Sequence, residues 1–314
     1  MGCSHSTKQS SQIVKVTVTD ELENEHKVTS LVILEDKRLA SATNAISVYS
    51  YNVNTKQWTK DINNECNGYG TVLCAMKGNR LLSCDSSIKV WTVSDVDMTL
   101  IKEIKEHKGT VNKVIPLSKE RFASCSNDKT VKIWKDDNTY ECITTIELIG
   151  NVSAILQLKG KEVLVSSSDN ISSDEELTFW NLNNWTKIHT VEGYSAYCST
   201  HIKELPNGDI AVVVKKEDIY FIVIIDTSSY EVKTEIYEDN YITYFSSLCV
   251  LNEHSFIYAC QGNFLQISCE DYSIMYKSRR GNFNGYTDIC LIEGGKFIAI
   301  ENETCISIVE PCYV

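Results

Sequence analysis

The first six residues, Met1-Gly2-Cys3-Ser4-His5-Ser6, form a pattern that could accept acyl groups. Removal of the methionine would expose the Gly2 amine, and a glycine there with serine at position 6 is the pattern for amide-linked myristate. Cys3 is placed for thioester-linked palmitate. One myristoyl chain holds a protein on a bilayer only marginally, so a second signal is needed. A basic patch cannot be that second signal, because only Lys8 and Lys15 occur before position 20. Palmitate on Cys3 is the remaining candidate.

Thirteen cysteines could form disulfides or bind a metal, but their spacing favours neither. No two stand as Cys-x-x-Cys, and most lie inside apolar runs such as Val72-Leu73-Cys74-Ala75. Residues 1–12 are polar, so no secretory signal is expected. We interpret the cysteines as free thiols that pack as small hydrophobic groups in a reducing, cytoplasmic compartment. We expect no metal and no cofactor, and a zinc site stays as the alternative.

Charge and hydropathy exclude two classes of partner or location. The net charge is −12, from 30 basic and 42 acidic residues. Nucleic acid is therefore not expected as a partner, because its phosphates would be repelled. No apolar run reaches about 18 residues, so no membrane span is expected.

Two sequence motifs recur in step and indicate which elements position these residues. The first is a polar turn followed by an apolar run, and it begins at Arg38, Arg80, Arg121, Glu162, Asp209, Ser255 and Lys296. The second is an alternating strand that ends at Tyr49, Trp91, Trp134, Trp180, Ile225, Ser268 and Val309. Both motifs repeat every 41 to 47 residues. That period is typical of one four-stranded propeller blade.

The repeats predict an all-β fold, a seven-bladed β-propeller over residues 13–314, preceded by a flexible tether of residues 1–12. Alternation with period two, as in Ile88-Lys89-Val90-Trp91, indicates strands, and no helical stripe is visible. The blades are expected at about residues 25–62, 69–105, 107–147, 150–191, 194–238, 241–280 and 285–314.

The last repeat contains only three strands, at residues 286–292, 296–300 and 305–309, which would leave an open sheet edge. In residues 13–19, valines alternate with Lys15 and two threonines, as in an outer strand with one face in water. We therefore expect residues 13–19 to complete the last blade and join the two ends of the chain. A free N-terminal extension is the alternative.

The third repeat resembles a WD repeat. It contains Glu106-His107-Lys108-Gly109 and then a serine, a turn aspartate and a tryptophan within residues 124–134. In that family such residues form a buried hydrogen-bonded tetrad, and the resemblance assigns this role to His107, Ser124, Asp128 and Trp134. By period the resemblance covers nearly the whole chain, but by motif it covers the third repeat alone.

The other repeats depart from the family pattern. The first has His26 but carries Asn44 near the turn and Tyr49 in place of tryptophan. The second and fourth keep Trp91 and Trp180 without an obvious histidine. The fifth to seventh retain the hydrophobic rhythm alone.

The resemblance implies a scaffold that binds other proteins or peptides on its top face, where each outer strand connects to the next inner strand. The residues expected to contact partners are Tyr69, Asn127, Tyr194, Tyr197, Tyr241, Tyr244, Arg279, Arg280 and Tyr286. Tyrosine offers a large amphipathic surface at low entropic cost. The alternative for each tyrosine is that it packs inward. Arg38, Arg80 and Arg121 fall at the opposite, bottom end and are interpreted as structural.

An insertion in the fourth repeat carries Ser172 and Ser173, each followed three residues later by an acid. This pattern is typical of acidophilic kinase sites, so both serines are candidate phosphorylation sites. An ordinary solvated loop is the alternative.

We expect neither catalysis nor a small-molecule substrate. The strands predicted to face the central channel contain one histidine, His201, and one aspartate, Asp288, which do not make a ligand or catalytic set. Two non-enzymatic interpretations remain. One is a scaffold held at the cytoplasmic face of a membrane by its acyl groups. The other is a soluble subunit of a larger complex, such as a ubiquitin ligase or a trafficking assembly.

Overall fold

The structure is a computed structural model. It describes residues 13–23, 28–52, 55, 57–65, 72–169, 176–194, 196, 202–216, 219–237, 246–260, 263–277, 286–291, 297–301 and 305–313. The description covers the backbone alone for residues 13–23, 64–65, 168–169, 215–216, 219, 246, 260, 263–264 and those from 286 onward.

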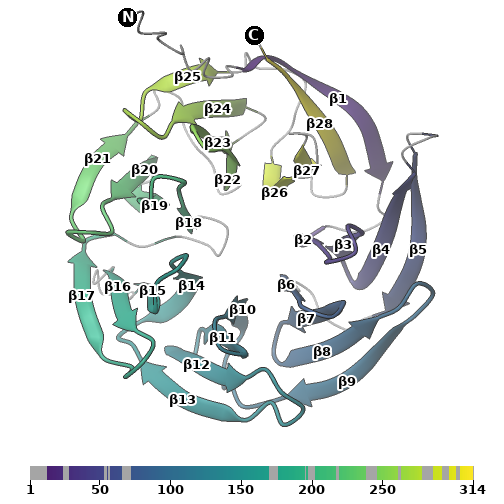
Figure 1. Ribbon diagram of the computed structural model, residues 1–314, viewed down its shortest axis with the longest axis horizontal. Helices are drawn as coiled ribbons and strands as arrows, with labels where there is room; N and C mark the ends of the chain where they lie inside the picture. The colour runs from purple at the N-terminus through teal and green to yellow at the C-terminus, as the bar shows by residue number, and fades with distance from the viewer. Residues whose placement is uncertain are drawn as a thin grey trace, which may run out of the picture.

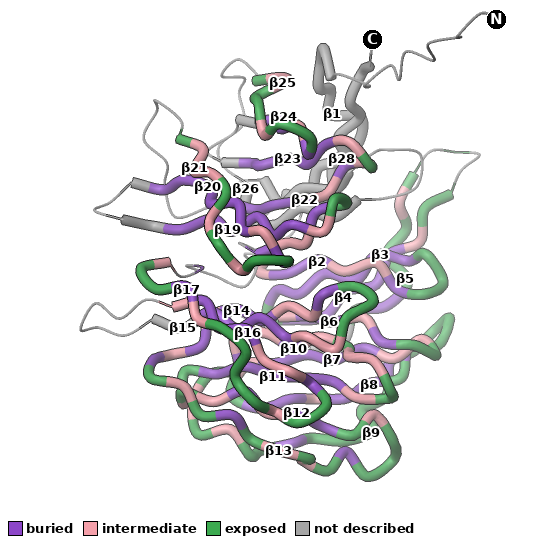
Figure 2. The backbone as a smooth tube through the Cα atoms, turned by 60° about the vertical axis from the view of Figure 1, so that its left-hand side comes forward, coloured by how far each residue is buried: buried purple, intermediate pink, exposed green. Residues whose placement is uncertain are grey.

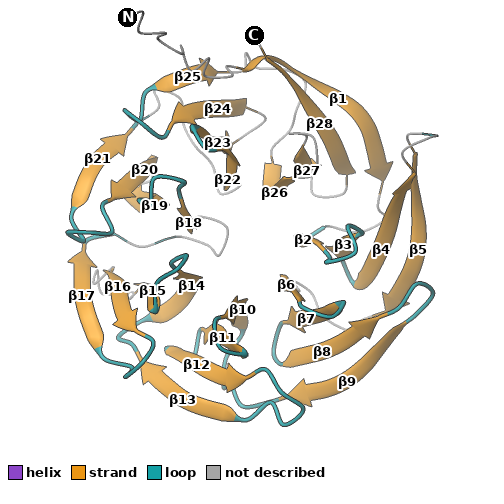
Figure 3. Cartoon of the chain, in the orientation of Figure 1, coloured by secondary structure: helices purple, strands orange, loops and turns teal. Residues whose placement is uncertain are grey.

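Every regular element in the described residues is a β-strand, and the strands form four-stranded antiparallel sheets set around a common centre (Figure 1, Figure 3). Blade 1 contains β2 (Ser30–Ile33), β3 (Leu39–Ala42), β4 (Ala45–Asn52) and β5 (Gln57–Glu65). Blade 2 contains β6 (Val72–Met76), β7 (Arg80–Cys84), β8 (Ile88–Val93) and β9 (Met98–Ile104). Blade 3 contains β10 (Val111–Leu117), β11 (Arg121–Ser126), β12 (Thr130–Lys135) and β13 (Cys142–Glu147).

The next three sheets follow the same order, with the first strand innermost and the last outermost. Blade 4 contains β14 (Asn151–Gln157), β15 (Val163–Asp169), β16 (Glu176–Asn181) and β17 (Lys187–Glu192). Blade 5 contains β18 (Ile202–Glu204), β19 (Ile210–Lys216), β20 (Ile219–Ile225) and β21 (Val232–Ile236). Blade 6 contains β22 (Ser246–Asn252), β23 (Ser255–Cys260), β24 (Asn263–Ser268) and β25 (Ile274–Lys277). The predicted all-β propeller architecture is confirmed.

The remaining sheet joins strands from both ends of the chain in the order β1-β28-β27-β26. Its strands are β1 (Ile13–Glu23), β26 (Tyr286–Leu291), β27 (Phe297–Glu301) and β28 (Cys305–Tyr313). Both β1 and β28 run four residues beyond the ends expected from alternation. The extra length includes Pro311, opposite Val16, where β28 pairs with β1 and no longer with β27. Proline interrupts an alternating pattern but is tolerated in such singly paired stretches.

The hydrophobic core lies between neighbouring blades. One buried cluster, for example, combines Leu82 and Val90 of blade 2 with Phe122 and Trp134 of blade 3. Buried residues therefore concentrate on the inner and middle strands, and exposed residues on outer strands and turns (Figure 2). Each blade stays in place because its two faces are covered by its neighbours.

The cysteines whose side chains the structure describes are free thiols, and most are buried in this core; they are Cys74, Cys84, Cys125, Cys142, Cys249 and Cys269. Burial raises the pKa of Cys74 and of Cys269 to about 12, which makes both thiols poor nucleophiles. Among the described residues, no helix is long and apolar enough to cross a lipid bilayer.

Candidate interaction surface

The four tetrad side chains of blade 3 are joined by hydrogen bonds. Trp134 Nε1 donates to Ser124 Oγ over 2.8 Å, and Ser124 Oγ lies 2.7 Å from His107 Nε2. His107 Nδ1 lies 2.8 Å from Asp128 Oδ2. The pattern fits a neutral imidazole that donates from Nδ1 and accepts at Nε2. The chain from indole to carboxylate leaves none of these buried polar groups unpaired.

The electrostatics of the tetrad favour that protonation state. Burial lowers the pKa of His107, and this outweighs the hydrogen bond to and the charge of Asp128. Burial alone would raise the pKa of Asp128. However, hydrogen bonds from Thr130, from the Lys108 backbone N–H and from His107 lower its pKa to about 2. At neutral pH the pair is therefore a neutral histidine beside an aspartate anion.

Part of the tetrad recurs in other blades. Trp91 Nε1 donates to Ser83 Oγ in blade 2, and Trp180 Nε1 donates to Ser166 Oγ in blade 4, each over 2.8 Å. In blade 1 the corresponding Ser41 Oγ is buried without a hydrogen-bond partner in the described part of the chain. The roles of Ser83 and Ser166 were not predicted. Ser83 lies three residues after Arg80, as Ser124 does after Arg121, whereas Ser166 lies four residues after Glu162.

The tetrad fixes the top end of blade 3, where the β9–β10 connection meets the β11–β12 turn. Asp128 Oδ2 accepts from the Lys108 backbone N–H over 2.9 Å, which ties the two segments together. Gly109 is required there, because a Cβ on it would lie 2.8 Å from the Asp128 backbone nitrogen. Asn112 Nδ2 donates to Asn127 Oδ1 over 2.6 Å and to the Val152 carbonyl over 2.8 Å. The turn is thus also joined to blade 4.

A pocket of about 400 Å³ lies beside this turn, outward of the tetrad. Its lining residues are Glu106, Lys108, Asp128, Lys129, Thr130, Lys132, Thr145, Glu147 and Leu148. They come from the β9–β10 connection, the β11–β12 turn and the two outer strands of blade 3, except Leu148, which directly follows β13. The volume is within the range of about 300–1,000 Å³ found for ligand-binding pockets.

The bottom ends of the blades are joined by polar contacts between neighbours. Arg38 Nη1 donates to the Ser94 carbonyl over 2.8 Å, from blade 1 to blade 2. Arg80 forms a two-pronged ion pair with Asp136 of blade 3, over 2.6 and 3.0 Å. Arg121 reaches Glu162 of blade 4 over 3.0 Å. These three arginines, interpreted above as structural, therefore bridge successive blades.

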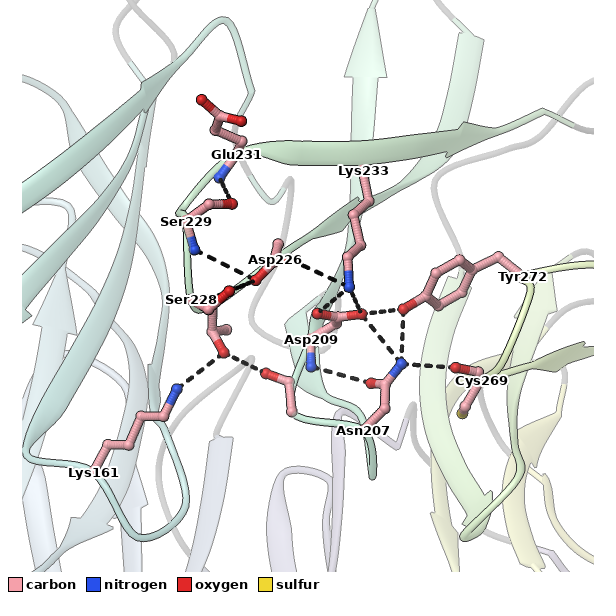
Figure 4. Close-up of polar contacts among 12 residues, drawn as sticks. Lys161, Asn207, Asp209, Asp226, Ser228, Ser229, Glu231, Lys233, Cys269 and Tyr272 are labelled. Atoms are coloured by element: carbon pink, nitrogen blue, oxygen red, sulfur yellow. Dashed lines mark hydrogen bonds and ion pairs between the residues drawn. The ribbon is translucent and has the colours of Figure 1, made fainter.

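Blades 4, 5 and 6 continue this series through the contacts in Figure 4. Lys161 Nζ of blade 4 donates to Thr227 Oγ1 of blade 5 over 3.1 Å. Lys233, Asn207 and Tyr272 converge on the buried Asp209 carboxylate, and Tyr272 comes from blade 6. The hydrogen bond to Asp209 raises the pKa of Lys233. These contacts join blades 4, 5 and 6 at the bottom end.

Of the residues expected to contact partners, Asn127 and Tyr194 have described side chains. Asn127 is exposed at the top turn of blade 3, and Tyr194 is half-buried and donates to Glu235 Oε1 over 2.7 Å. That bond contributes most to a pKa of about 12 for Tyr194. The Tyr286 backbone lies at the start of β26. Outside the described residues lie Tyr69, Tyr197, Tyr241, Tyr244, Arg279, Arg280, Gly2, Cys3, Ser172, Ser173 and His26.

No group of three or more histidine, cysteine, aspartate or glutamate side chains in the described ranges is arranged to hold a metal ion.

Comparison with known proteins places one repeat in a family. Residues 98–135 match the family model described as WD domain, G-beta repeat. The matched residues run from the start of β9 to the end of β12. The chain is 27% identical to nuclear distribution protein PAC1 of Candida albicans over 117 residues. The alignment covers 36% of this chain and 23% of PAC1. The chain is also 29% identical to nuclear distribution protein nudF 1 of Talaromyces marneffei over 126 residues. That alignment covers 37% of this chain and 25% of nudF 1. The matches thus span about a quarter of each relative's length.

Proposed function

This chain belongs to the WD40-repeat β-propeller family, and on that basis we propose that it is a non-catalytic scaffold that binds protein partners at the top ends of its blades. WD40 propellers are generally non-catalytic, and the proposed partners are other proteins or peptides.

The observation that carries this proposal is the fixed geometry of the top end of blade 3, which lies beside a pocket. At the bottom end, Arg80, Asp136 and Arg121 are taken up in ion pairs to neighbouring blades. At the top end, Asn127 and Lys129 are exposed on a turn that the tetrad holds in one geometry, beside the pocket. A rigid surface with accessible polar groups favours binding, because little conformational entropy is lost when a partner docks.

Affinity capture with top-face variants tests the proposal. We expect Tyr241→Ala and Tyr286→Ala to weaken recovery of partners that the wild-type protein captures, while the melting temperature stays unchanged. Tyr51→Ala is the matched control, because Tyr51 is an exposed tyrosine near the bottom end of β4. Equal recovery with all three variants would argue against a top-face site.

We propose further that residues 13–314 form one seven-bladed propeller in which β1 completes the last blade. The support is the antiparallel pairing of β1 with β28, from Ile13 opposite Tyr313 to Glu23 opposite Cys305. Deletion of residues 1–20 would remove most of this strand and expose the edge of β28. Soluble yield and melting temperature should both fall, and unchanged values would contradict closure by β1.

The membrane tether remains a separate proposal, supported by the sequence Met1-Gly2-Cys3-Ser4-His5-Ser6. Myristate on Gly2 and palmitate on Cys3 would together hold the propeller at a membrane. Metabolic labelling with a clickable myristate should mark the wild-type protein and not Gly2→Ala. An unlabelled wild-type protein would leave the soluble-subunit interpretation in its place.

A further inference from the structure

The outer strands of blades 1 to 6 share a position that carries a large side chain in every case. Each of these strands has a β-bulge, where one of its residues is left unpaired against the neighbouring strand. The shared position lies three residues before the unpaired one, near the bottom end of the blade. The residues there, in blade order, are Trp58, Met98, Tyr140, Trp185, Tyr230 and Tyr272. These six are the rim residues.

Four of the rim residues have a left-handed backbone. The φ angle is 54° at Tyr140, 63° at Trp185, 63° at Tyr230 and 60° at Tyr272. A bulky side chain rarely adopts this conformation, which glycine adopts without strain. Such strain persists only where the surrounding structure stabilises it. The contacts of these four side chains therefore indicate why the strain is retained.

Two of the four make polar or charged contacts with the preceding blade. The Arg121 guanidinium of blade 3 lies 5.4 Å from the centre of the Trp185 ring in blade 4. The Tyr272 hydroxyl of blade 6 donates to the Asp209 carboxylate of blade 5 (Figure 4). In both cases the contact joins two blades.

Other rim residues pack against apolar parts of the preceding blade. The Tyr230 ring of blade 5 lies 4.7 Å from the Phe179 ring and 5.7 Å from the His189 ring, centre to centre, and both of these belong to blade 4. Tyr140 is 5% exposed in the cluster that joins blades 2 and 3. Met98 is 3% exposed in the cluster that joins blades 1 and 2. Each of the five interfaces from blade 1 to blade 6 therefore contains a rim residue of the later blade.

The outer strands of blades 3 and 4 have few other buried residues. In β13 the buried residue is Ile146, and in β17 it is Val191, each close to the top end of its strand. At their bottom ends these strands depend on Tyr140 and Trp185 for contact with the preceding blade.

We propose that the rim residues are latches, each of which holds its outer strand against the preceding blade so that the strand does not detach alone. This inference goes beyond the proposed scaffold function and does not depend on it. An outer strand is paired on one side only, and its detachment exposes the hydrogen-bonding edge of the next strand. The latches keep that edge covered.

Hydrogen exchange in the full-length protein, measured by mass spectrometry of peptic fragments that span the outer strands, tests this inference. Trp185→Gly removes the latch of blade 4, while glycine relieves the backbone strain. We expect exchange of the β17 amides to rise at least about tenfold, because local opening governs the exchange of paired amides. Exchange of β9, which lies two blades away, should stay unchanged.

The melting temperature gives a second test, because strain and contact predict opposite signs. Relief of strain alone raises the melting temperature of Trp185→Gly, whereas loss of a latch lowers it. Lys129→Gly is the matched control, since Lys129 is also left-handed, with φ of 67°, but has an exposed side chain. This control should keep the wild-type protection of β17, with an unchanged or higher melting temperature.

Trp185→Tyr keeps a ring beside Arg121 and should retain wild-type protection, because tyrosine fills this position in blades 3, 5 and 6. Three results would overturn the inference: unchanged exchange of β17 in Trp185→Gly, a higher melting temperature of that variant, or an equal loss of protection in Trp185→Tyr. None of these results bears on partner capture, so the scaffold function is tested separately.

Discussion

The Trp134 indole N–H donates to the hydroxyl of Ser124 across the β11–β12 pair over 2.8 Å. Ser124 in turn contacts the imidazole of His107, so one hydroxyl satisfies two buried ring nitrogens. This hydroxyl is the centre of the tetrad, and blades 2 and 4 retain the tryptophan–serine half of it.

Ser124→Ala should lower the free energy of unfolding by about 1–3 kcal/mol, because it leaves buried ring nitrogens of Trp134 and His107 unpaired. Ser41→Ala is the matched control. Ser41 occupies the same place in blade 1, where its hydroxyl has no partner in the described residues, so its removal should cost less than about 0.5 kcal/mol. Denaturant titration of both variants checks the difference, and equal losses would contradict the account of the tetrad.

The lowered pKa of His107 predicts a pH dependence of stability. The unfolded chain has a histidine pKa near 6.5 and binds the proton first as pH falls, so the unfolded state gains stability relative to the folded one. The contribution of His107 is therefore complete above pH 6.5 and declines below it. Asp128 adds a second loss of stability as the pH falls from its ordinary pKa of 3.8 to its folded-state pKa of about 2.

Melting temperatures measured at pH 7.5 and 5.5 test this prediction. The wild-type protein should lose stability over this range, and His107→Gln should lose less of it, although it is less stable at pH 7.5. An identical pH dependence in the two proteins would show that His107 is not the titrating group.

Removal of a bridge between blades at the bottom end should destabilise the protein more than removal of a surface ion pair. Arg80→Met breaks the two-pronged pair with Asp136, whose side chains are 22% and 13% exposed, and we expect a loss of about 1–3 kcal/mol. Lys135→Met is the control, since its pair with Glu141 lies within one blade and is largely exposed. We expect a smaller loss of stability for Lys135→Met than for Arg80→Met, because solvent screens an exposed pair.

A double-mutant cycle with Asp136→Asn isolates the pair itself. The effects of Arg80→Met and Asp136→Asn should not add, because each variant removes the same contact. Additive losses would show that Arg80 stabilises the protein through packing rather than through Asp136.

The sequence predicted local features better than contacts between blades. Repeats beginning at residues such as Arg80 and Arg121 predicted where strands begin, because apolar alternation and turn residues act locally. The roles of the tetrad residues came from the resemblance of one repeat. Neither source identified the partners of the bottom arginines, since Arg80 and Asp136 are 56 residues apart and meet only when blades pack.

The pocket could not be predicted for a related reason. Its lining combines the β11–β12 turn with residues of β12 and β13, and which of them lie side by side depends on the register of β12 against β13. Likewise, the sequence alone could not show that Tyr194 contacts Glu235, because these residues belong to segments 41 residues apart.

Site-specific photo-crosslinking would show whether partners bind at the top end of the propeller. Asn127 and Asn138 are exposed asparagines in the turns before and after β12, at the top and bottom of the same blade. A benzoylphenylalanine introduced at each position in cells would report what lies within reach. The account predicts partner adducts from position 127 and few from position 138. Adducts from position 138 alone, or equal adducts from both, would contradict it.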